Sequence, residues 1–422
     1  MPITSAPPLS VREAQTKILD RIRPLDAERV PLRDAAGRVA AGSVTSGLDL
    51  PPWDNSAMDG YAVRASDVAP GSELPVALDL PAGSASGQLL PDAATARIMT
   101  GAPLPEGADA IVPVEDTTGP AGEGRFAEIG ERVRFDVRAE PGAHVRRRGE
   151  DVRRGAVVLE PGDPLRPARI ALLATVGRGE VLVFRRPHVA IVSTGDELVD
   201  IDQAGAPDRI VNGNAHGLAA QIAAAGGVPH PLPIAPDDPA AIRAAIDAAL
   251  EHDAVVTIGG VSVGPRDHVR DALREAGVEL VFWRTAIRPG GPVAFGATAG
   301  GRPVFGLPGN PVSAHVTFEL FARPALRRMA GHARCFRRPV RGRLAEAVST
   351  RPEKAYYLRV RIEPDLDGWI AAPIGAQGSA ILTGLAAADG LAIVPLGVGD
   401  LPAGAEVDIL PLDGWAAEVE AP

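Results

Sequence analysis

The sequence predicts a multidomain protein of the α/β plus β class that contains a doubly wound, mostly parallel domain. Between residues 188 and 330, apolar strand-like runs alternate with amphipathic helical ones. From about 30 to 160 and again from 336 to 413, short β-prone runs alternate with Pro/Gly turns. The chain has 422 residues, 45% of them hydrophobic, which suggests about three domains with cores of their own.

The first expected element is an amphipathic helix. Ser10 and Glu13 have the spacing of a capping box, and the apolar stripe that follows consists of Val11, Ala14, Ile18 and Ile22. The helical period then disappears over the β-prone section, which predicts one or two β-rich domains. It returns at residues 166–176, which we expect to form a helix that packs back on the first one.

The section from 188 to 330 has continuous apolar strands joined by helices, which indicates a doubly wound, mostly parallel sheet. One predicted helix covers 214–227 with Asn214 as its N-cap, and another begins at Pro239 with Asp238 as its cap. Alternation at 356–362, a DLDG turn and two later strand-like runs predict a C-terminal β domain. The predicted strands of the sheet are 188–194, 253–258, 278–283, 292–296 and 302–307.

Charge and cysteine content exclude several classes of protein. With a net charge of −10, the chain lacks the basic field that nucleic-acid binding uses, so we interpret the arginine-rich segments 145–154 and 327–343 as solvated faces. The single cysteine, Cys335, excludes an internal disulfide and a Cys-clustered metal site, which fits a reducing cytoplasm. No signal peptide or membrane span is evident. We expect a soluble cytoplasmic protein.

Three strand ends carry unusual loops. Ligands of a doubly wound sheet lie beyond the carboxyl ends of its strands, where this chain has STGDEL (193–198), GGVSVGPRD (259–267) and GLPGNPVS (306–313). Glycines leave main-chain N–H groups accessible and prolines fix the path, so these loops are typical of an anion site. The candidate phosphate-binding residues are Gly259, Gly260, Ser262, Gly264, Pro308, Gly309, Asn310, Pro311 and Ser313.

Carboxylates accompany these loops. Asp196, Glu197 and Asp267 would face the phosphate, and a divalent cation between them would remove the repulsion; hard oxygen ligands suit Mg²⁺. Each loop taken alone is equally compatible with a tight connection. Fingerprints of dinucleotide and P-loop sites are absent, and the eight histidines lie at least 14 residues apart, which excludes HExxH-type sites. We predict a phosphate ligand with magnesium.

Six motifs, in order, carry a resemblance to one family. The chain from about residue 9 to 413 resembles the molybdopterin molybdenumtransferases of the MoeA type, which are related to the gephyrin E domain. The motifs are PPWDNSAMDGYAVRASD (51–67), IMTGAPLPEGADAIVPVEDT (98–117), STGDELV (193–199), GGVSVGPRD (259–267), FWRTAIRPGGPVAFG (282–296) and GLPGNPVSA (306–314).

The resemblance implies four regions and a homodimer. One subunit's sheet crevice would form a shared site with the inserted domain of the other subunit. Contacts with a molybdopterin adenylyltransferase and with molybdoenzyme-maturation proteins are also implied. The regions are a discontinuous helical/β domain at 9–28 and 148–180, an inserted β-rich domain at 29–147, a molybdopterin-binding doubly wound domain at 181–330 and a C-terminal β domain at 336–413.

The implied reaction takes molybdopterin-AMP and molybdate, uses Mg²⁺ and releases AMP, leaving molybdenum on the dithiolene. The family pattern gives catalytic roles to Asp59, Thr100, Glu197 and Asp267, and its three carboxylates would hold Mg²⁺. Each has a structural alternative: Asp59 could form an Asx turn, Thr100 a cap, and Asp267 the cap of its helix. Asp237 and Ser379 match substrate-binding positions.

The chain departs from the family pattern at RTAIRPGG, where lysines usually stand at the positions of Arg284 and Arg288, the implied molybdate contacts. Arginine keeps the charge but presents a planar fork, so the exchange is not neutral. The general arginine bias of the chain, which has only two lysines, offers a second explanation. Tungstate in place of molybdate, a molybdopterin adenylyltransferase, and a gephyrin-like scaffold or substrate carrier remain alternative functions.

Overall fold

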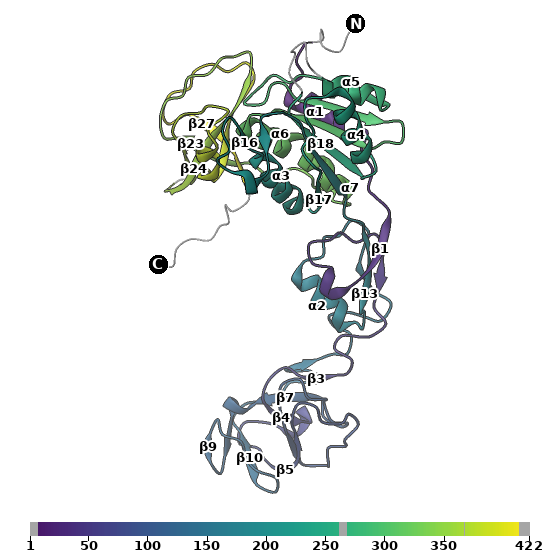
Figure 1. The fold of residues 1–422 in the computed structure, drawn as a ribbon. Coiled ribbons are helices and arrows are strands. Elements are labelled where there is room, and N and C mark those ends of the chain that lie inside the picture. Colours follow the sequence, from purple (N-terminus) through teal and green to yellow (C-terminus); the bar gives the residue numbers. More distant parts are fainter. Residues whose placement is uncertain (1–6, 261–267, 367, 413–422) are drawn as a thin grey trace.

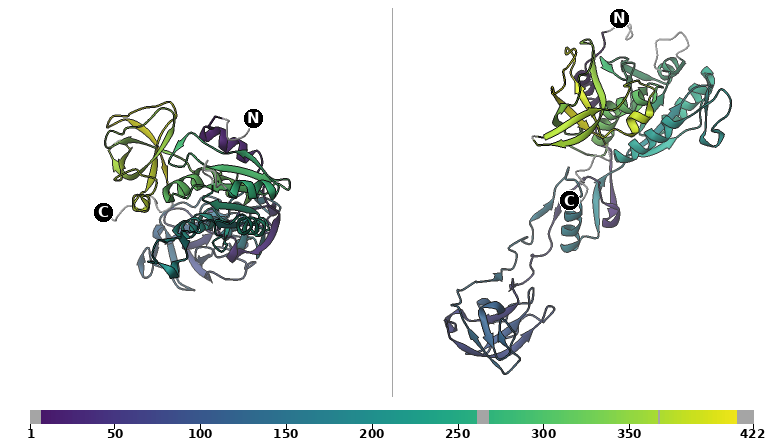
Figure 2. Two further views of the ribbon diagram at one scale, coloured as in Figure 1. Left: turned by 45° about the horizontal axis from the view of Figure 1, so that its top comes forward. Right: turned by 90° about the vertical axis from the view of Figure 1, so that its left-hand side faces the viewer.

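The computed structural model describes residues 7–260, 268–366 and 368–412. The molecule is elongated, with three bodies in a row (Figures 1 and 2). A large α/β domain with a C-terminal β domain beside it occupies one end, a small helical and β unit follows, and an inserted β unit occupies the other end. Among the helices of the described ranges, none is long and apolar enough to cross a membrane.

Helix α1 (Val11–Leu19) has the predicted capping box: Glu13 N donates to Ser10 Oγ, and Ser10 N donates to the Glu13 carboxylate. The predicted packing partner was wrong, however. Ala14 and Ile18 of α1 join the core of the α/β domain together with Phe321. Helix α2 (Pro167–Thr175) instead belongs to the small middle unit.

Antiparallel pairs hold the middle unit together: β1 (Ala27–Pro31) with β13 (Glu180–Phe184), and β2 (Val44–Thr45) with β12 (Val157–Leu159). Its core contains Val30, Ala40, Leu165 and Leu173. This pairing corrects the predicted boundary after residue 28, since residues up to 45 pair here and not in the inserted unit. A local strand pattern does not reveal a pairing partner more than a hundred residues away.

The inserted unit has a seven-stranded sheet of order β7-β4-β6-β5-β10-β8-β9. Gly60 opens β4 because a Cβ there would lie 2.1 Å from Val112 O in the neighbouring strand. One hydrophobic core includes Tyr61 and Phe135, and a second includes Leu80 and Ile98. The strands are β3 (Asn55–Ser56), β4 (Gly60–Val63), β5 (Glu73–Leu80), β6 (Thr95–Ile98), β7 (Ala110–Pro113), β8 (Thr117–Gly119), β9 (Gly122–Glu123), β10 (Arg132–Phe135) and β11 (Val145–Arg146).

The α/β domain confirms the doubly wound, mostly parallel sheet. Its strand order is β17-β14-β18-β22-β21-β19; the first four strands are parallel, and β21 is antiparallel to both neighbours. The strands are β14 (His188–Ser193), β17 (Val228–Pro231), β18 (Ala254–Ile258), β19 (Val278–Phe282), β21 (Ala294–Thr298) and β22 (Pro303–Leu307), and the helices between them are α3 (Gly213–Ala224), α4 (Pro239–Ala249) and α5 (His268–Glu275).

Helix caps in this domain confirm one prediction and correct another. Asp238 caps α4 by accepting a hydrogen bond from Ala241 N, with Pro239 as the first helical residue. Helix α3 is capped by Asn212, which accepts from Ala215 N, and not by Asn214. Asn214 is the second residue of α3, and its side chain is therefore available for another contact.

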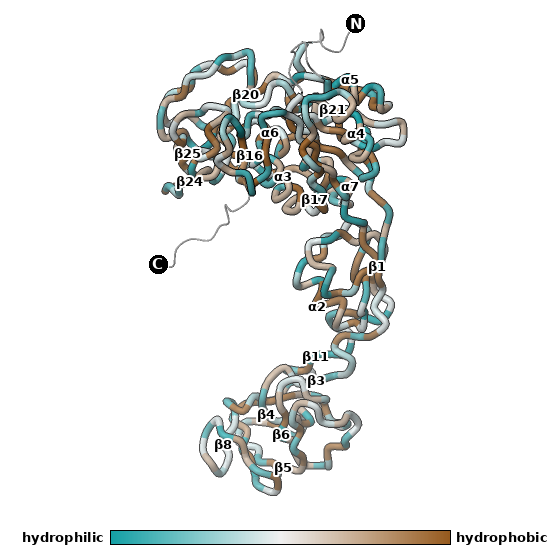
Figure 3. Tube along the Cα trace, in the orientation of Figure 1, coloured by the Kyte–Doolittle hydropathy of each residue, from teal (hydrophilic) through white to brown (hydrophobic). Residues whose placement is uncertain are grey.

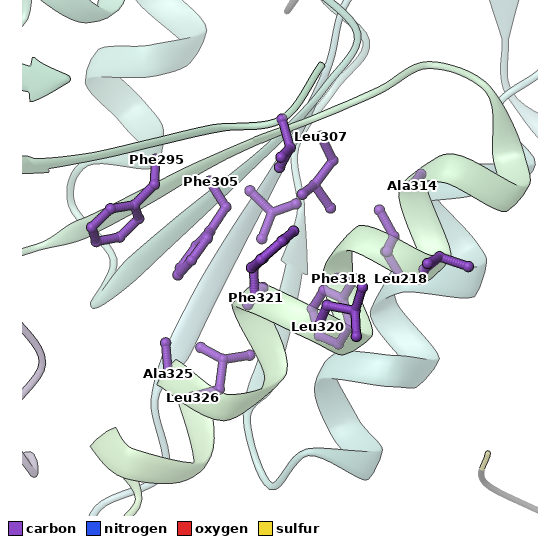
Figure 4. Packing of buried hydrophobic residues seen from close by; sticks show 14 of the residues in the cluster. Leu218, Phe295, Phe305, Leu307, Ala314, Phe318, Leu320, Phe321, Ala325 and Leu326 are labelled. Carbon is purple, nitrogen blue, oxygen red and sulfur yellow. The ribbon is translucent and has the colours of Figure 1, made fainter. Parts of the chain in front are cut away.

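The last helical segment of the domain runs through α6 (Pro311–Thr317), a π-helical turn at Phe318–Ala322 and α7 (Arg323–Met329). Phe318, Phe321 and Leu326 pack against Phe305 and Leu307 of β22 (Figure 4). Hydrophobic segments accordingly gather inside this domain, whereas many connecting loops are hydrophilic (Figure 3). The packed core fixes where α6 begins relative to the strand ends.

The C-terminal domain is a β barrel. Its sheet has the order β20-β24-β25-β23-β27-β26, and a further pairing of β24 with β26 closes it. β20 (Ile287–Arg288) comes from the α/β domain, so the two domains share hydrogen bonds. The remaining elements are β23 (Val340–Leu344), β24 (Ala355–Asp365), β25 (Gly368–Pro373), α8 (Leu382–Ala386), β26 (Gly390–Val394) and β27 (Glu406–Pro411).

Candidate functional site

The carboxyl ends of β14, β18 and β22 meet along one edge of the parallel sheet. From β14 the chain passes through α3 to β17 on one side, then through α4 to β18 on the other side. The strand order therefore reverses between β14 and β18, and such switch points are where open α/β sheets bind ligands. All three sequence-predicted loops begin at this edge.

The loops after β18 and β22 lie side by side. Gly259 N donates to Leu307 O at 3.0 Å, and a Cβ on Gly309 would lie 3.9 Å from Gly259 Cα. Gly260 has φ +63°, and a Cβ there would lie 2.2 Å from Val269 Cγ2, so glycine is required for this close turn. Pro308 is buried, whereas Gly309 and Asn310 are exposed. Ser262, Gly264 and Asp267 lie outside the described residues.

The start of α6 joins two distant parts of the chain to this loop. Val312 N donates to Ser379 O at 3.0 Å, which brings the GAQGS motif of the C-terminal domain against the buried Ser313. A Cβ on Gly290 would lie 3.4 Å from Ser313 O and 2.3 Å from Thr317 Cγ2 at the end of α6, so the loop after Arg288 also packs on this helix. Residues 308–313 are therefore the centre of the site.

Three predicted carboxylates line the edge beside β14. Asp237 N donates to Asp196 Oδ1 at 3.0 Å, which places Asp237 next to the STGDEL loop. A Cβ on Gly195 would lie 2.5 Å from Glu197 Oε2, so the Glu197 carboxylate folds back over that glycine. All three acidic side chains are exposed.

Magnesium fits this edge only as a partner of a substrate phosphate. Within the described part of the chain, no three His, Cys, Asp or Glu side chains are grouped to hold a metal ion. Mg²⁺ commonly keeps several waters and takes one or two carboxylates together with substrate phosphates. The exposed Glu197 suits that mode, whereas Asp59 directly precedes β4 of the inserted unit, which lies at the far end of the same chain (Figure 1).

Arg288 borders a cavity of about 440 Å³ that joins the RTAIRPGG motif to the C-terminal barrel. Gly375, Gln377 and Gly378 line the same cavity, and the Arg288 guanidinium lies 5.8 Å from the centre of the Tyr356 ring. Arg284 is half-buried, and its carbonyl accepts a hydrogen bond from Leu9 N at 3.1 Å. Of the two predicted molybdate contacts, Arg288 is the one that borders this cavity.

Asp59 and Thr100 contact each other directly although 41 residues separate them. Thr100 N and Thr100 Oγ1 both donate to Asp59 Oδ1, at 2.7 and 2.8 Å. These hydrogen bonds stabilise the carboxylate and hold the pKa of Asp59 below its usual value. The pair lies in the inserted unit, away from the sheet edge of its own chain (Figure 1).

Comparison with known proteins agrees with this arrangement. Three family models match: the MoeA N-terminal region (domain I and II) at residues 9–177, a probable molybdopterin binding domain at 190–328, and the MoeA C-terminal region (domain IV) at 341–412. "Molybdopterin molybdenumtransferase 2" of Mycobacterium tuberculosis is 39% identical over 413 residues, which is 95% of this chain and 98% of that protein. This chain belongs to the MoeA family.

Other MoeA-type proteins are similar over the whole length. The "Molybdopterin molybdenumtransferase" of Staphylococcus aureus is 32% identical over 422 residues, or 98% of both chains. A crystal structure of the molybdopterin biosynthesis MoeA protein from Pyrococcus horikoshii OT3 matches with a TM-score of 0.81 at 30% identity and covers 96% of this chain and 100% of that one.

Two residues of this MoeA chain were missed by the sequence analysis. Asn214 Nδ2 donates to Gly309 O at 2.7 Å. Arg359 is 1% exposed, and its guanidinium donates to Gly378 O and Ala376 O at 3.0 and 2.7 Å, which shapes the loop before Ser379. The alternating pattern of β24 contained a signal for the second, since Arg359 occupies a position between apolar neighbours.

Proposed function

We propose that this MoeA-family protein inserts molybdate into adenylylated molybdopterin, with Mg²⁺-dependent release of AMP. Relatives that match over nearly the whole chain carry the name molybdopterin molybdenumtransferase. The observation that carries the proposal is the convergence on residues 308–313 of the Gly259 loop, the Ser379 motif and the loop after Arg288. A phosphate group, a pterin and an oxyanion would each bind to a different part of this site.

The main-chain amides of Gly260, Gly309 and Asn310 would bind the molybdopterin phosphate, while Gly259, whose N–H donates to Leu307 O, would hold the two loops together. Small residues let the backbone approach the ligand closely, and Asn214 holds Gly309 in place. Ser313 and Ser379 would border the pterin, and Asp237 would accept a hydrogen bond from it. Ser262, Gly264 and Asp267 belong to this proposal as family positions.

Glu197 and Asp267, with Asp59 of a second subunit, would hold Mg²⁺, which when bound supplies positive charge at the pyrophosphate oxygens. Arg288 and Arg284 would position molybdate and stabilise charge that develops on the phosphoryl group. The planar guanidinium of Arg288 can bind an oxyanion through two N–H groups at once. The intact charge at both positions favours a working oxyanion site.

A homodimer with shared sites completes the proposal. Asp59 and Thr100 flank β4 and β6 of the inserted unit, which lies at the opposite end of the elongated chain from the α/β domain (Figure 1), so a second copy must supply them if they act at the sheet edge. We further propose a cytoplasmic enzyme that receives its substrate from a molybdopterin adenylyltransferase and passes the product to molybdoenzyme-maturation proteins.

The test is AMP release from molybdopterin-AMP bound to purified protein with Mg²⁺, with molybdate, with tungstate, and with neither. We expect release that depends on molybdate and that slows with Arg288→Gln, while Arg361→Gln, an exposed arginine of β24, serves as a matched control. Tight binding without release under either oxyanion would instead indicate a carrier or scaffold. ATP consumption with free molybdopterin would indicate an adenylyltransferase.

A further inference from the structure

A cleft of about 910 Å³ lies where the middle unit meets the α/β domain. Its walls are residues 36–38 and 162–169 of the middle unit, Arg186 of the connection, and 223–226 and 327–334 of the α/β domain. Arg186 precedes β14, and residue 226 precedes β17. The cleft is therefore at the amino ends of these strands, whereas the candidate functional site is at the carboxyl ends of the parallel strands.

Arginine dominates the wall of this cleft. The segment 327–343, interpreted from sequence as a solvated face, contributes two of the arginines, while its Arg337 binds the buried Glu319. Asp163 is the acidic residue of the wall, and it pairs with Arg169 at 2.8 Å. The arginines that line the cleft are Arg38, Arg166, Arg169, Arg186, Arg327 and Arg334.

Three of these guanidinium groups are not neutralised. Within residues 7–260, 268–366 and 368–412, the side chains of Arg166, Arg186 and Arg334 form no ion pair or hydrogen bond, and all three are exposed. Arg38, by contrast, pairs with Glu28 and donates to Phe184 O. Three uncompensated positive charges from separate segments converge here in a chain whose net charge is −10.

The environment of His332 shows the same positive field. Burial and the neighbouring Arg327 and Arg323 lower the pKa of this imidazole to about 4, and its Nδ1 lies 3.2 Å from Arg327 Nη2. The histidine is therefore neutral at physiological pH and adds no charge to the cleft, whose acidic residue, Asp163, is already paired with Arg169.

We propose that this cleft binds a small, multiply charged anion of the phosphate-ester class, separate from the ligands of the candidate functional site. Guanidinium groups match phosphate oxygens through paired N–H donors. A volume of about 910 Å³ is in the range of sites for ligands of nucleotide size. Because the walls come from two units, the bound anion bridges them and stabilises one relative orientation.

Residue-resolved modification by phenylglyoxal, which reacts with arginine, tests the proposal on the full chain with sodium pyrophosphate as the probe. At ten times the dissociation constant, pyrophosphate should slow modification of Arg166, Arg186 and Arg334 by about tenfold. Arg302, Arg343 and Arg361, which are exposed and lie outside the cleft, should react at an unchanged rate. Because each arginine is followed separately, anion binding at the other site does not interfere.

A matched pair of variants sharpens this test. Arg334→Gln should raise the pyrophosphate concentration needed to protect Arg166 and Arg186 by about tenfold, while Arg361→Gln should leave it unchanged. Equal protection of the three cleft arginines and the three control arginines would overturn the proposal, and so would protection of none of them. Protection that needs no pyrophosphate and grows with protein concentration would also overturn it, since a second copy of the chain would then cover the cleft.

Discussion

The inserted β unit and the edge of the parallel sheet assemble their candidate residues in different ways. In the inserted unit, Asp59 and Thr100 are brought together by adjacent strands, β4 and β6, and bind each other. At the sheet edge, Gly259, Gly309 and Ser379 come from three separate segments and are joined through main-chain contacts. The first arrangement is complete within one small unit, whereas the second requires two packed domains.

This difference has a consequence for the proposed dimer. A pair that is ordered within its own unit can be presented intact to a second molecule. An edge built from main-chain groups offers donors for a ligand but few fixed side chains. The two regions are therefore complementary. Because they lie far apart in one chain, variants of each region can be mixed to test whether two copies share a site.

The largest effect is expected from mixing two inactive variants. Asp59→Asn and Glu197→Gln should each lower AMP release by about a hundredfold. Random reassociation would make half of the dimers hybrid, each with one intact site of its two, so about a quarter of the wild-type rate should return. The measurement is AMP release after co-unfolding and refolding, or after co-expression.

A pair from the same region is the matched control for this mixing. Asp59→Asn with Thr100→Val leaves a defect in every shared site, so no activity should return. If AMP release returned in this control mixture, or failed to return in the first mixture, the result would contradict a site shared between the inserted unit and the sheet edge.

Gly260→Ala should be the most destabilising single change at the sheet edge. The new Cβ would lie 2.2 Å from Val269 Cγ2, and the alanine would have to keep the positive φ of Gly260. We therefore expect a loss of about 3 kcal/mol in the stability of the α/β domain. Gly301→Ala, which has a positive φ but no atom within 4 Å, isolates the backbone cost and should lose about 1 kcal/mol. Calorimetry on both variants measures the difference; equal losses would show that the contact with Val269 does not matter.

Asn214→Ala tests whether a side-chain tether orders the main chain of the edge. Loss of the hydrogen bond to Gly309 O should weaken binding of molybdopterin-AMP about fivefold, with little change in the melting temperature. Asn212→Ala removes the cap of the same helix and should instead cost about 1 kcal/mol of stability. Titration and thermal unfolding separate the two effects. Unchanged substrate affinity in Asn214→Ala would remove this residue from the site.

The smallest effect is a pH dependence at Asp59. Its pKa is lower in the folded protein than the unfolded value near 3.8, so its stabilising contribution is present above that value and is lost as the pH falls through the folded pKa. The difference in melting temperature between wild type and Asp59→Asn should therefore shrink below about pH 4. Asp202→Asn, which removes a carboxylate at another exposed position, is the control.

Much of the fold follows from local pattern in the sequence. The capping box of α1, the cap of α4 and the apolar strands of the sheet depend on residues close together in the chain, so their spacing predicts them. The Gly/Pro loops after β18 and β22 were predicted in the same way, because a strand end followed by glycine or proline is a local signal. Their ligands remain predictions.

Pairing partners and side-chain contacts over long distances were decided by the tertiary structure alone. Three features join segments that are far apart in the chain and whose local patterns do not predict the contact. They are the packing of α1 on Phe321, the hydrogen bond from Asn214 to Gly309 and the arginine cleft. His188, His230 and His252 are spaced too widely for a sequence motif. The rings of His188 and His230 stack with centres 4.9 Å apart, and the ring of His252 is tilted against His230 at 4.6 Å. Local periodicity fixes which face of an element is apolar, whereas the partner of that face is chosen by the packing of the whole chain.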